Sequence, residues 1–349
     1  MLRKGFVFRV IISSLLAAYA MLLITPTQLK AKAAVIAPES KAECVMELNS
    51  RRVLYQAHGD TRLPMASTTK VVTCITVLEL CSDLDKQIAI PKEAVGIEGS
   101  SVYLKEGELY SIKDLLYGLM LRSGNDCATA LALHCSGTVA KFTTEMNKIA
   151  QRAGALNSNF ENPHGLPCDG HYTTAYDLAL ITCYAMQNPV FCEIVGTKNY
   201  NARHWKNKNK MLALYEGGIG VKTGYTKEAG RCLVSAAKRE DMTLVCVVLS
   251  SPMTYERSAK LMDDAFALYK RVCLLGETEE LQIEGTKIKG TAKKAYYYPL
   301  IEEEKEVVEI HTQAAKNYDK HKKEGEIVGK FEIYLAKRLL FSGNLYKLE

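Results

Sequence analysis

Three short motifs in this chain hold residue types that could build one active site. They are Ser67-Thr68-Thr69-Lys70, Ser123-Gly124-Asn125 and Lys222-Thr223-Gly224, in that order along the sequence. Each motif alone is weak evidence, because short patterns with two fixed positions recur by chance in chains of this size. All three together predict a site built on a serine nucleophile, with lysine partners in place of a histidine base.

The chemistry of such a site depends on a lysine that has lost its proton. Ser67 and Lys70 lie three residues apart, so on a helix they share one face. A lysine with an ordinary pKa of ~10.4 is charged at neutral pH and cannot accept the serine proton. Lowering that pKa by ~2 to 3 units disfavours the charged form by roughly 2.7 to 4 kcal/mol, which burial and a nearby cation can supply. We therefore expect Ser67 to be the nucleophile and Lys70 its base, with Lys222 as the nearby cation.

These motifs resemble those of a known enzyme class. Serine β-lactamases and penicillin-binding proteins carry the same trio, with the middle motif usually written Ser-Asp-Asn. Over about residues 40 to 270 the chain is similar to the low-molecular-weight penicillin-binding proteins, the D-alanyl-D-alanine carboxypeptidase family. The stretches that carry this likeness are Arg62 to Ala66, Ser123 to Asp126, Asn162 to Leu166 with Thr174 to Asp177, and Gly220 to Thr226 with Gly230.

The resemblance implies a role for each motif residue. Ser123 would relay a proton between Lys70 and the leaving amine, and Asn125 would hold the substrate amide. Lys222 and Thr223 would recognise the terminal carboxylate of the substrate, while Gly224 lets the strand lie close to the peptide.

The resemblance also implies an oxyanion hole and a further cation. The family pattern assigns the hole to the backbone N–H groups of Ser67 and Tyr225, each typically worth ~3 kcal/mol of barrier. Many family members have an arginine before the third motif that assists with the carboxylate. Here that segment reads Lys206-Asn207-Lys208-Asn209-Lys210, and Lys208 is our candidate for this cation. A solvated basic turn without a role in binding explains the segment at least as well.

The function implied is removal of the terminal D-alanine from peptidoglycan stem peptides through an acyl-serine intermediate, with β-lactam antibiotics as covalent inhibitors. A D,D-endopeptidase needs the same residues and remains an alternative. A class A β-lactamase would place a Glu-x-x-Leu-Asn loop between the second and third motifs, and the sequence has none there. A non-catalytic wall-binding scaffold is the rival from another class, and the intact motifs argue against it.

No cofactor or metal is expected. His164, Cys168, Asp169 and His171 are metal-ligand types, but their stretch matches a family loop and has no second cluster. Residues 217–223 resemble a phosphate loop, yet Val221 stands where its second glycine must be.

The first 33 residues have the pattern of a secretory signal peptide. A basic start holds Arg3, Lys4 and Arg9, and a largely apolar run of 15 residues and an Ala31-Lys32-Ala33 cleavage site follow. The run is shorter than the ~20 residues of a membrane span, so we expect export and cleavage after Ala33. Removing residues 1–33 lowers the net charge from +6 to +1, which argues against a nucleic-acid partner.

The eleven cysteines do not form a disulfide framework. Their number is odd, and none of their spacings is C-x-x-C. Cys74 and Cys246 stand inside apolar runs, where a free cysteine behaves as a small buried hydrophobe. Cys127, beside the second motif, is likewise expected to belong to the core. We expect most of them to be packed as thiols.

The periodicity predicts helices on an antiparallel sheet, and the family resemblance implies that this α+β arrangement is the β-lactamase/transpeptidase-like fold. Strands are expected over 43–48, 53–55, 220–223, 232–236 and 243–250, and helices over 64–80, 114–121, 126–135, 177–186 and 256–273. We expect the catalytic domain over 34–275 and a small all-β domain over 276–349, a candidate contact with membrane or wall. No amphipathic helix follows its last strand, so easy release from membranes is expected.

Overall fold

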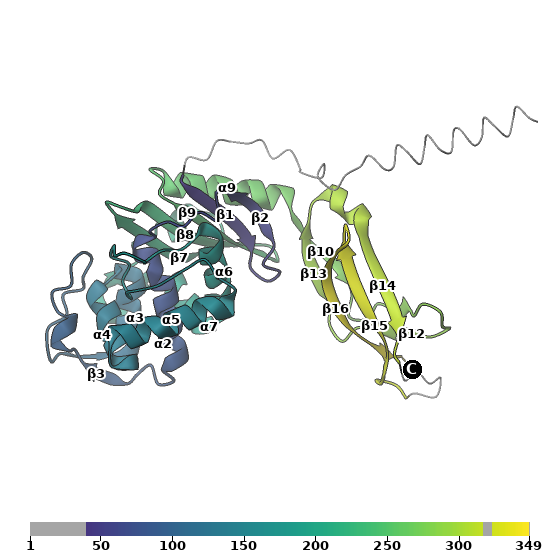
Figure 1. Cartoon of the computed structure of the whole chain (residues 1–349), viewed down its shortest axis with the longest axis horizontal. Helices are drawn as coiled ribbons and strands as arrows, with labels where there is room; N and C mark the ends of the chain where they lie inside the picture. The colour runs from purple at the N-terminus through teal and green to yellow at the C-terminus, as the bar shows by residue number, and fades with distance from the viewer. Residues whose placement is uncertain (1–39, 317–322, 349) are drawn as a thin grey trace, which may run out of the picture. The chain divides into compact units, whose positions relative to one another are not determined.

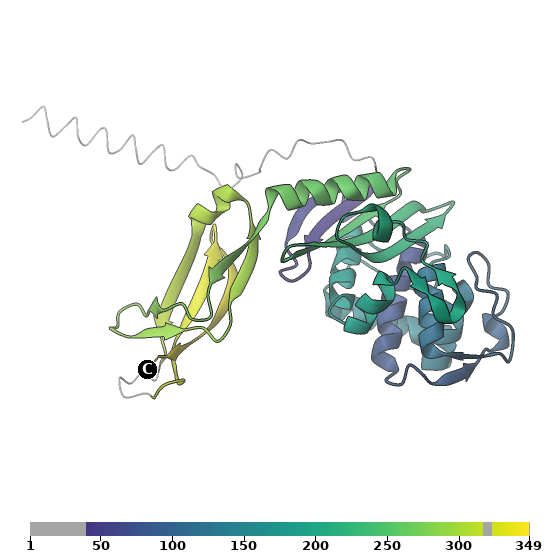
Figure 2. The ribbon, with the colours of Figure 1, turned by 180° about the vertical axis from the view of Figure 1, so that it is seen from behind.

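The computed structural model describes residues 40–316 and 323–348; the expected signal peptide lies outside them. The described residues form two compact units, which Figures 1 and 2 show from opposite sides. The catalytic unit comprises 40–279 and 292–306, and the C-terminal unit comprises the rest from residue 280 onward. The units therefore do not follow the single boundary expected at residue 276. The reason is that β13 (Tyr296–Leu300) returns to pair with β10 (Lys270–Leu275).

The catalytic unit is built on a five-stranded antiparallel sheet in the order β2-β1-β9-β8-β7. Its strands are β1 (Ala42–Glu47), β2 (Val53–Ala57), β7 (Gly218–Thr226), β8 (Gly230–Arg239) and β9 (Met242–Leu249). The predicted hairpin at the N-terminal side and the meander before the last helix are both confirmed. Strand β7, which carries the third motif, lies at one edge of the sheet.

Helices cover both faces of this sheet, which explains why β9 is apolar along its whole length. Successive side chains of a strand point to opposite faces. Val245 and Val247 accordingly belong to the core under the main helical layer, and Leu244 and Cys246 pack on the other side with α9. Figures 1 and 2 show α9 lying along one face of the sheet and the main helical layer on the other. Met211, from the short helix Met211–Leu214, belongs to the buried cluster on the α9 side.

The α-helices of the described residues differ in how they begin, and four have a side-chain cap. The α-helices are α2 (Lys70–Leu80), α3 (Ile112–Tyr117), α4 (Asn125–Ser136), α5 (Val139–Ala153), α6 (Ala175–Ala185), α7 (Pro189–Gly196), α8 (Met211–Leu214) and α9 (Thr254–Leu268). The side chains of Ser111, Thr138, Thr174 and Asn188 each accept a backbone N–H at the start of α3, α5, α6 and α7. Two small hairpins, β3 (Gln87–Ala89) with β4 (Leu109–Ser111) and β5 (Asn199–Tyr200) with β6 (Trp205–Lys206), complete the unit.

The predicted last helix was wrong at its C-terminal end. It was expected to reach Cys273, but α9 ends at Leu268 and Tyr269 is already extended. Residues 270–275 form β10 because they pair with β13, a partner more than twenty residues further along the chain. Periodicity within the segment could not indicate that partner.

A buried ion pair fixes α9 to the sheet. Arg257 donates from Nε and Nη2 to the two carboxylate oxygens of Glu43 on β1, each at 2.7 Å. Both side chains are almost completely buried, so each charge depends on the other and on the hydroxyl of Tyr55 nearby.

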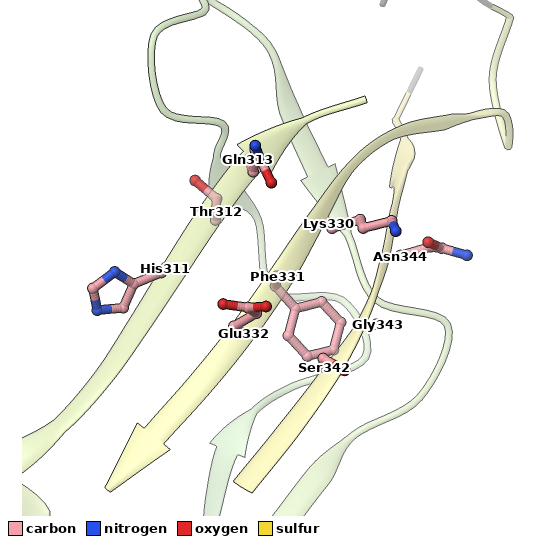
Figure 3. A pocket seen from close by; sticks show the side chains of 9 residues that line it. All are labelled: His311, Thr312, Gln313, Lys330, Phe331, Glu332, Ser342, Gly343 and Asn344. Carbon is pink, nitrogen blue, oxygen red and sulfur yellow. The ribbon is translucent and has the colours of Figure 1, made fainter. Parts of the chain in front are cut away.

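The C-terminal unit is all-β, as predicted. Its sheet has the order β11-β12-β16-β15-β14, with strands β11 (Leu281–Gln282), β12 (Lys289–Thr291), β14 (Val308–Ala314), β15 (Ile327–Leu335) and β16 (Arg338–Lys347). Phe331 and Ile333 are buried on one face. A hollow of about 300 Å³ lies on this sheet. Figure 3 shows the side chains that line it, among which His311, Gln313, Lys330 and Glu332 are polar and exposed.

Within residues 40–316 and 323–348, no single helix is long and apolar enough to cross a membrane. Only the pair α6 and α7, bent by 110°, reaches the required length and composition when taken together.

Candidate active site

The structure brings the three motifs together at the edge strand β7. Ser67 lies in a 3-10 turn, Ala66–Thr69, that leads directly into α2, and Lys70 is the first residue of that helix. Asn125 is the first residue of α4. Strand β7 passes over the Ser67 turn and contributes Lys222 and its neighbours. The site thus lies where two helices begin beneath the end of the sheet (Figure 1).

Gly224 is what allows β7 to approach the nucleophile. A Cβ atom at this position would lie 3.0 to 3.1 Å from the backbone nitrogens of Ser67 and Thr68 and from the carbonyl oxygen of Met65. These are backbone atoms that cannot rotate away. The expectation for Gly224 was a close approach of the strand to the substrate peptide; the close approach in the structure is to the nucleophile turn.

The amine of Lys70 is fully buried and lies within hydrogen-bonding distance of three oxygens. Its Nζ atom is 3.0 Å from Ser67 Oγ, 2.6 Å from Asn125 Oδ1 and 2.6 Å from the carbonyl oxygen of His164. The last two oxygens can only accept. A neutral amine has two N–H groups and one lone pair, so the two acceptors take the N–H groups and the lone pair faces the Ser67 hydroxyl.

Electrostatics favour that neutral amine. Burial lowers the pKa of Lys70 well below its usual value, and the charge of Lys222 lowers it further. Asp126 and Cys127 act in the opposite direction, and Lys208 adds a smaller lowering effect. The expected influence of Lys222 is thus present, but burial is the larger cause.

Lys222 is itself a buried cation. Its side chain is 1% exposed, and its Nζ donates to the carbonyl oxygen of Thr223 at 2.8 Å. Burial, followed by the charge of Lys208, lowers the pKa of Lys222 to about 7. The site therefore holds two amines that are both costly to protonate, and an anion that arrived between them would relieve that cost.

The second motif is arranged differently from the expectation. Ser123 is buried in a left-handed conformation after the turn Gly118–Arg122, and within the described residues its hydroxyl makes no hydrogen bond to Lys70. Asn125, expected to hold the substrate, holds Lys70 through Oδ1 and donates from Nδ2 to the carbonyl oxygen of Glu98 at 2.5 Å. Nδ2 carries two N–H groups, so one donor remains for a substrate carbonyl beside the bond to Glu98.

The backbone N–H of Ser67 is available as an oxyanion donor. Among the described residues it has no hydrogen-bond acceptor, whereas the neighbouring Thr68 N–H donates to Met65. Tyr225 follows Gly224 on β7, and its side chain is 65% exposed. A free backbone donor beside the nucleophile is what a tetrahedral oxyanion requires.

Sequence reasoning missed the loop that supports Asn125. The carboxylate of Asp126 is buried and accepts the Ser101 hydroxyl at 2.5 Å and the backbone N–H of Val102 at 3.0 Å. This loop supplies the Glu98 carbonyl that binds Asn125 and the Ser100 carbonyl that accepts the Asn125 backbone N–H at 2.7 Å. The only signal was Asp126 in the family stretch, because the loop itself has no motif.

The His164 carbonyl was also missed, although its loop was recognised. Gly165 adopts φ +90°, and a Cβ there would lie 2.0 Å from the Ala66 carbonyl oxygen, so this loop packs directly on the nucleophile turn. His171 accepts the Glu161 N–H at Nδ1, and its Nε2 lies 2.9 Å from Thr69 Oγ1. Burial lowers the pKa of His171 to about 4 and that of His164 to about 3, so both imidazoles are neutral.

Lys208 stands at the rim of a basic hollow. Its Nζ is 3.3 Å from Ser100 Oγ, and its backbone N–H donates to Leu121, two residues before Ser123. Leu212 and Leu214 are among the residues that line a hollow of about 670 Å³ beside it. The cations lining it are Arg122, Lys198, Lys206, Lys208 and Lys210, and none forms an ion pair with another described residue.

Comparison with known proteins identifies the family of this chain. A family model described as D-alanyl-D-alanine carboxypeptidase matches residues 27–253. D-alanyl-D-alanine carboxypeptidase DacF of Bacillus subtilis is 33% identical over 249 residues, which cover 67% of this chain and 64% of the relative. The DacA enzyme of Haemophilus influenzae is 30% identical over 345 residues, covering 92% of this chain and 85% of the relative.

Solved structures show the same fold. Penicillin binding protein 5 from Haemophilus influenzae aligns with a TM-score of 0.74 at 27% identity, covering 89% of this chain and 97% of that one. The Streptomyces K15 DD-transpeptidase aligns with a TM-score of 0.63 at 35% identity, covering 66% of this chain and 98% of that one.

The fold and the site define a serine peptidase of the penicillin-binding class, and the expected β-lactamase/transpeptidase-like fold is confirmed. The chain belongs to the D-alanyl-D-alanine carboxypeptidase family, the low-molecular-weight penicillin-binding proteins.

The buried charge of Lys222 makes stability depend on pH. The unfolded chain keeps this lysine protonated up to ~10.4, whereas the folded chain releases the proton from about 7 upward. The cost of burying the charge is thus full below about pH 7 and fades as the pH rises toward ~10.4. Lys222→Met should raise the free energy of unfolding by about 2 to 4 kcal/mol near pH 6.5, and the gain should shrink steadily up to pH 10.

Denaturant unfolding of both proteins across this range is the measurement. Lys141→Met, at an exposed position of α5, is the control and should stay within ~0.5 kcal/mol of the parent. A gain for Lys222→Met that is the same at every pH would contradict the buried-charge account.

Proposed function

We propose that this chain removes the terminal D-alanine from peptidoglycan stem peptides through an acyl intermediate on Ser67. The observation that carries this proposal is the hydrogen-bonding pattern of Lys70, whose lone pair faces the Ser67 hydroxyl when the amine is neutral. Peptide hydrolysis needs such an activated hydroxyl, an oxyanion donor and a holder for the carboxylate end. The described site contains a group that could serve each of these three needs.

Acylation follows from these contacts. Ser67 Oγ attacks the carbonyl carbon before the last D-alanine while its proton moves to the Lys70 lone pair. The Ser67 N–H, with the N–H of Tyr225, stabilises the oxyanion. As the tetrahedral intermediate collapses, the leaving amine takes a proton from Lys70, with Ser123 as the relay. Water then attacks the acyl ester and regenerates the free serine.

Recognition of the terminal carboxylate is assigned to β7. Lys222 and the Thr223 hydroxyl would bind it, with Lys208 as the additional cation from the neighbouring segment. A bound carboxylate favours the protonated form of Lys222 and so raises its pKa from about 7. The cations around the basic hollow contribute a positive potential that attracts an anionic substrate.

The β-lactamase alternative is not favoured by the loop facing the nucleophile. In this family member the loop 162–166 contributes a backbone carbonyl to Lys70 and one neutral imidazole, that of His164, and it carries no glutamate that would activate water. We infer that β-lactams acylate Ser67 and are released slowly. A D,D-endopeptidase would use the same groups on a longer leaving peptide.

The nucleophile assignment gives a direct prediction. Ser67→Ala should abolish both covalent labelling by a fluorescent penicillin and D-alanine release from a pentapeptide that ends in D-Ala-D-Ala. Lys70→Ala should lower both rates by at least ~10³-fold, because the hydroxyl then has no base. Circular dichroism checks that the variants are folded. Covalent labelling of Ser67→Ala at the parent rate would show that another residue is the nucleophile.

A second prediction separates pKa tuning from binding at β7. Removing the Lys222 charge raises the pKa of Lys70, so less of it is neutral at any pH and the acidic limb of the pH–rate profile should move to higher pH in Lys222→Ala. Thr223→Ala removes a hydrogen bond, worth ~1.5 to 3 kcal/mol to a charged partner, and should leave that limb in place. The measurement is kcat/KM against pH. If the acidic limbs of the parent protein, Lys222→Ala and Thr223→Ala coincide, Lys222 has a role in binding only.

We also propose that the protein acts outside the cytoplasm after cleavage behind Ala33, and that its C-terminal unit contacts the wall or the membrane. The polar hollow on that sheet supports the proposed contact with the wall or the membrane.

Mass spectrometry of the exported protein should give Ala34 as its first residue. Cosedimentation with purified cell walls or vesicles should weaken in the double variant His311→Ala/Lys330→Ala and persist in Ser67→Ala. A retained leader would contradict cleavage behind Ala33. Unchanged sedimentation of the double variant would contradict the contact through the C-terminal unit.

A further inference from the structure

Two cysteines that are distant in sequence meet behind the active site. Cys81 follows the last residue of α2, and Cys135 lies in the last turn of α4. Their Sγ atoms are 3.2 Å apart, across 54 positions of sequence. All eleven cysteines lie within the described residues as free thiols, and this is the one thiol–thiol contact among them. A bond of ~2.05 Å needs only a small further approach.

The environment of the pair differs from that of the other cysteines. Six cysteines are buried, and burial raises the pKa of each of them, which makes them inert. Cys81 and Cys135 are both partly exposed. The hydrogen bond between the two thiols and the charge of Lys86 lower the pKa of Cys81 to about 7 against the effect of burial, while the pKa of Cys135 is raised.

We propose that Cys81 and Cys135 form an oxidative modification site, which closes to an intramolecular disulfide by exchange with a small disulfide or an oxidised dithiol protein. The Cys81 thiolate attacks one sulfur of the oxidant and releases the other as a thiolate. Cys135 then loses its proton and attacks Cys81 sulfur in the mixed disulfide, which releases the second thiolate. Two cysteine thiols are oxidised and one oxidant disulfide is reduced to two thiols.

The position of the pair gives the modification a consequence for the catalytic unit. Helices α2 and α4 begin in the active site, where Lys70 Nζ meets Asn125 Oδ1, and they end at Cys81 and Cys135. The disulfide would join the two helices at their far ends and close a loop that contains residues 98–104 and Ser123. A cross-link over a loop of this length restricts the unfolded chain and raises the unfolding temperature. This proposal does not depend on the substrate of the enzyme.

The test uses the full chain, fully reduced and then incubated with oxidised glutathione. Digestion without reductant and mass spectrometry should find one new cross-link, between the peptides that carry Cys81 and Cys135, with a loss of about 2 Da that dithiothreitol reverses. The melting temperature should rise on the order of 5 °C on oxidation. Cys81→Ser and Cys135→Ser should each abolish the cross-link and the shift. Cys273→Ser, at an exposed cysteine on β10, is the matched control and should keep both.

The peptide map of the oxidised parent protein, without any substitution, tests the proposal even if a variant folds poorly. Stable glutathione adducts on Cys81 with no cross-link, cross-links at other cysteines, or a temperature shift that survives in Cys81→Ser would each overturn it.

Discussion

The active site depends on one buried amine. Lys70 can act as a base only if it is neutral, and burial of Nζ together with the charge of nearby Lys222 lowers its pKa in that direction. Burial requires that every N–H of the amine has a partner, and the carbonyl oxygens of His164 and Asn125 fill that need. The loop that delivers the His164 carbonyl and the helix start that delivers Asn125 are therefore part of the catalytic chemistry.

The same requirement explains the close packing around the nucleophile turn. Gly165 lets one loop lie against Ala66 from one side, and Gly224 lets β7 lie against Ser67 from another. Each glycine occupies a place where a Cβ would meet backbone atoms, so neither contact could be relieved by a change of rotamer. Helices α2 and α4 hold the arrangement from beneath, and at their far ends the thiols of Cys81 and Cys135 come together.

Much of the fold could be predicted from local pattern. The hairpin of β1 and β2, the meander of β7 to β9 and the helices carrying Lys70 and Asn125 follow from periodicity and turn residues within each segment. The end of α9 was missed, because residues 270–275 become a strand only through pairing with β13. For the same reason the unit boundary could not be read from sequence: β13 lies beyond the expected boundary but packs with the catalytic unit.

The sequence by itself determined which chemical groups are present and which element carries each of them, because motif spacing and helix periodicity are local properties. Ser67, Lys70 and Lys222 could therefore be chosen from sequence alone. Tertiary structure alone decided the hydrogen bonding and the pKa of those groups. Hydrogen-bond partners and desolvation come from residues distant in sequence, so the His164 carbonyl, the Asp126-anchored loop and the bond between Asn125 and Lys70 became visible only once the chain was folded.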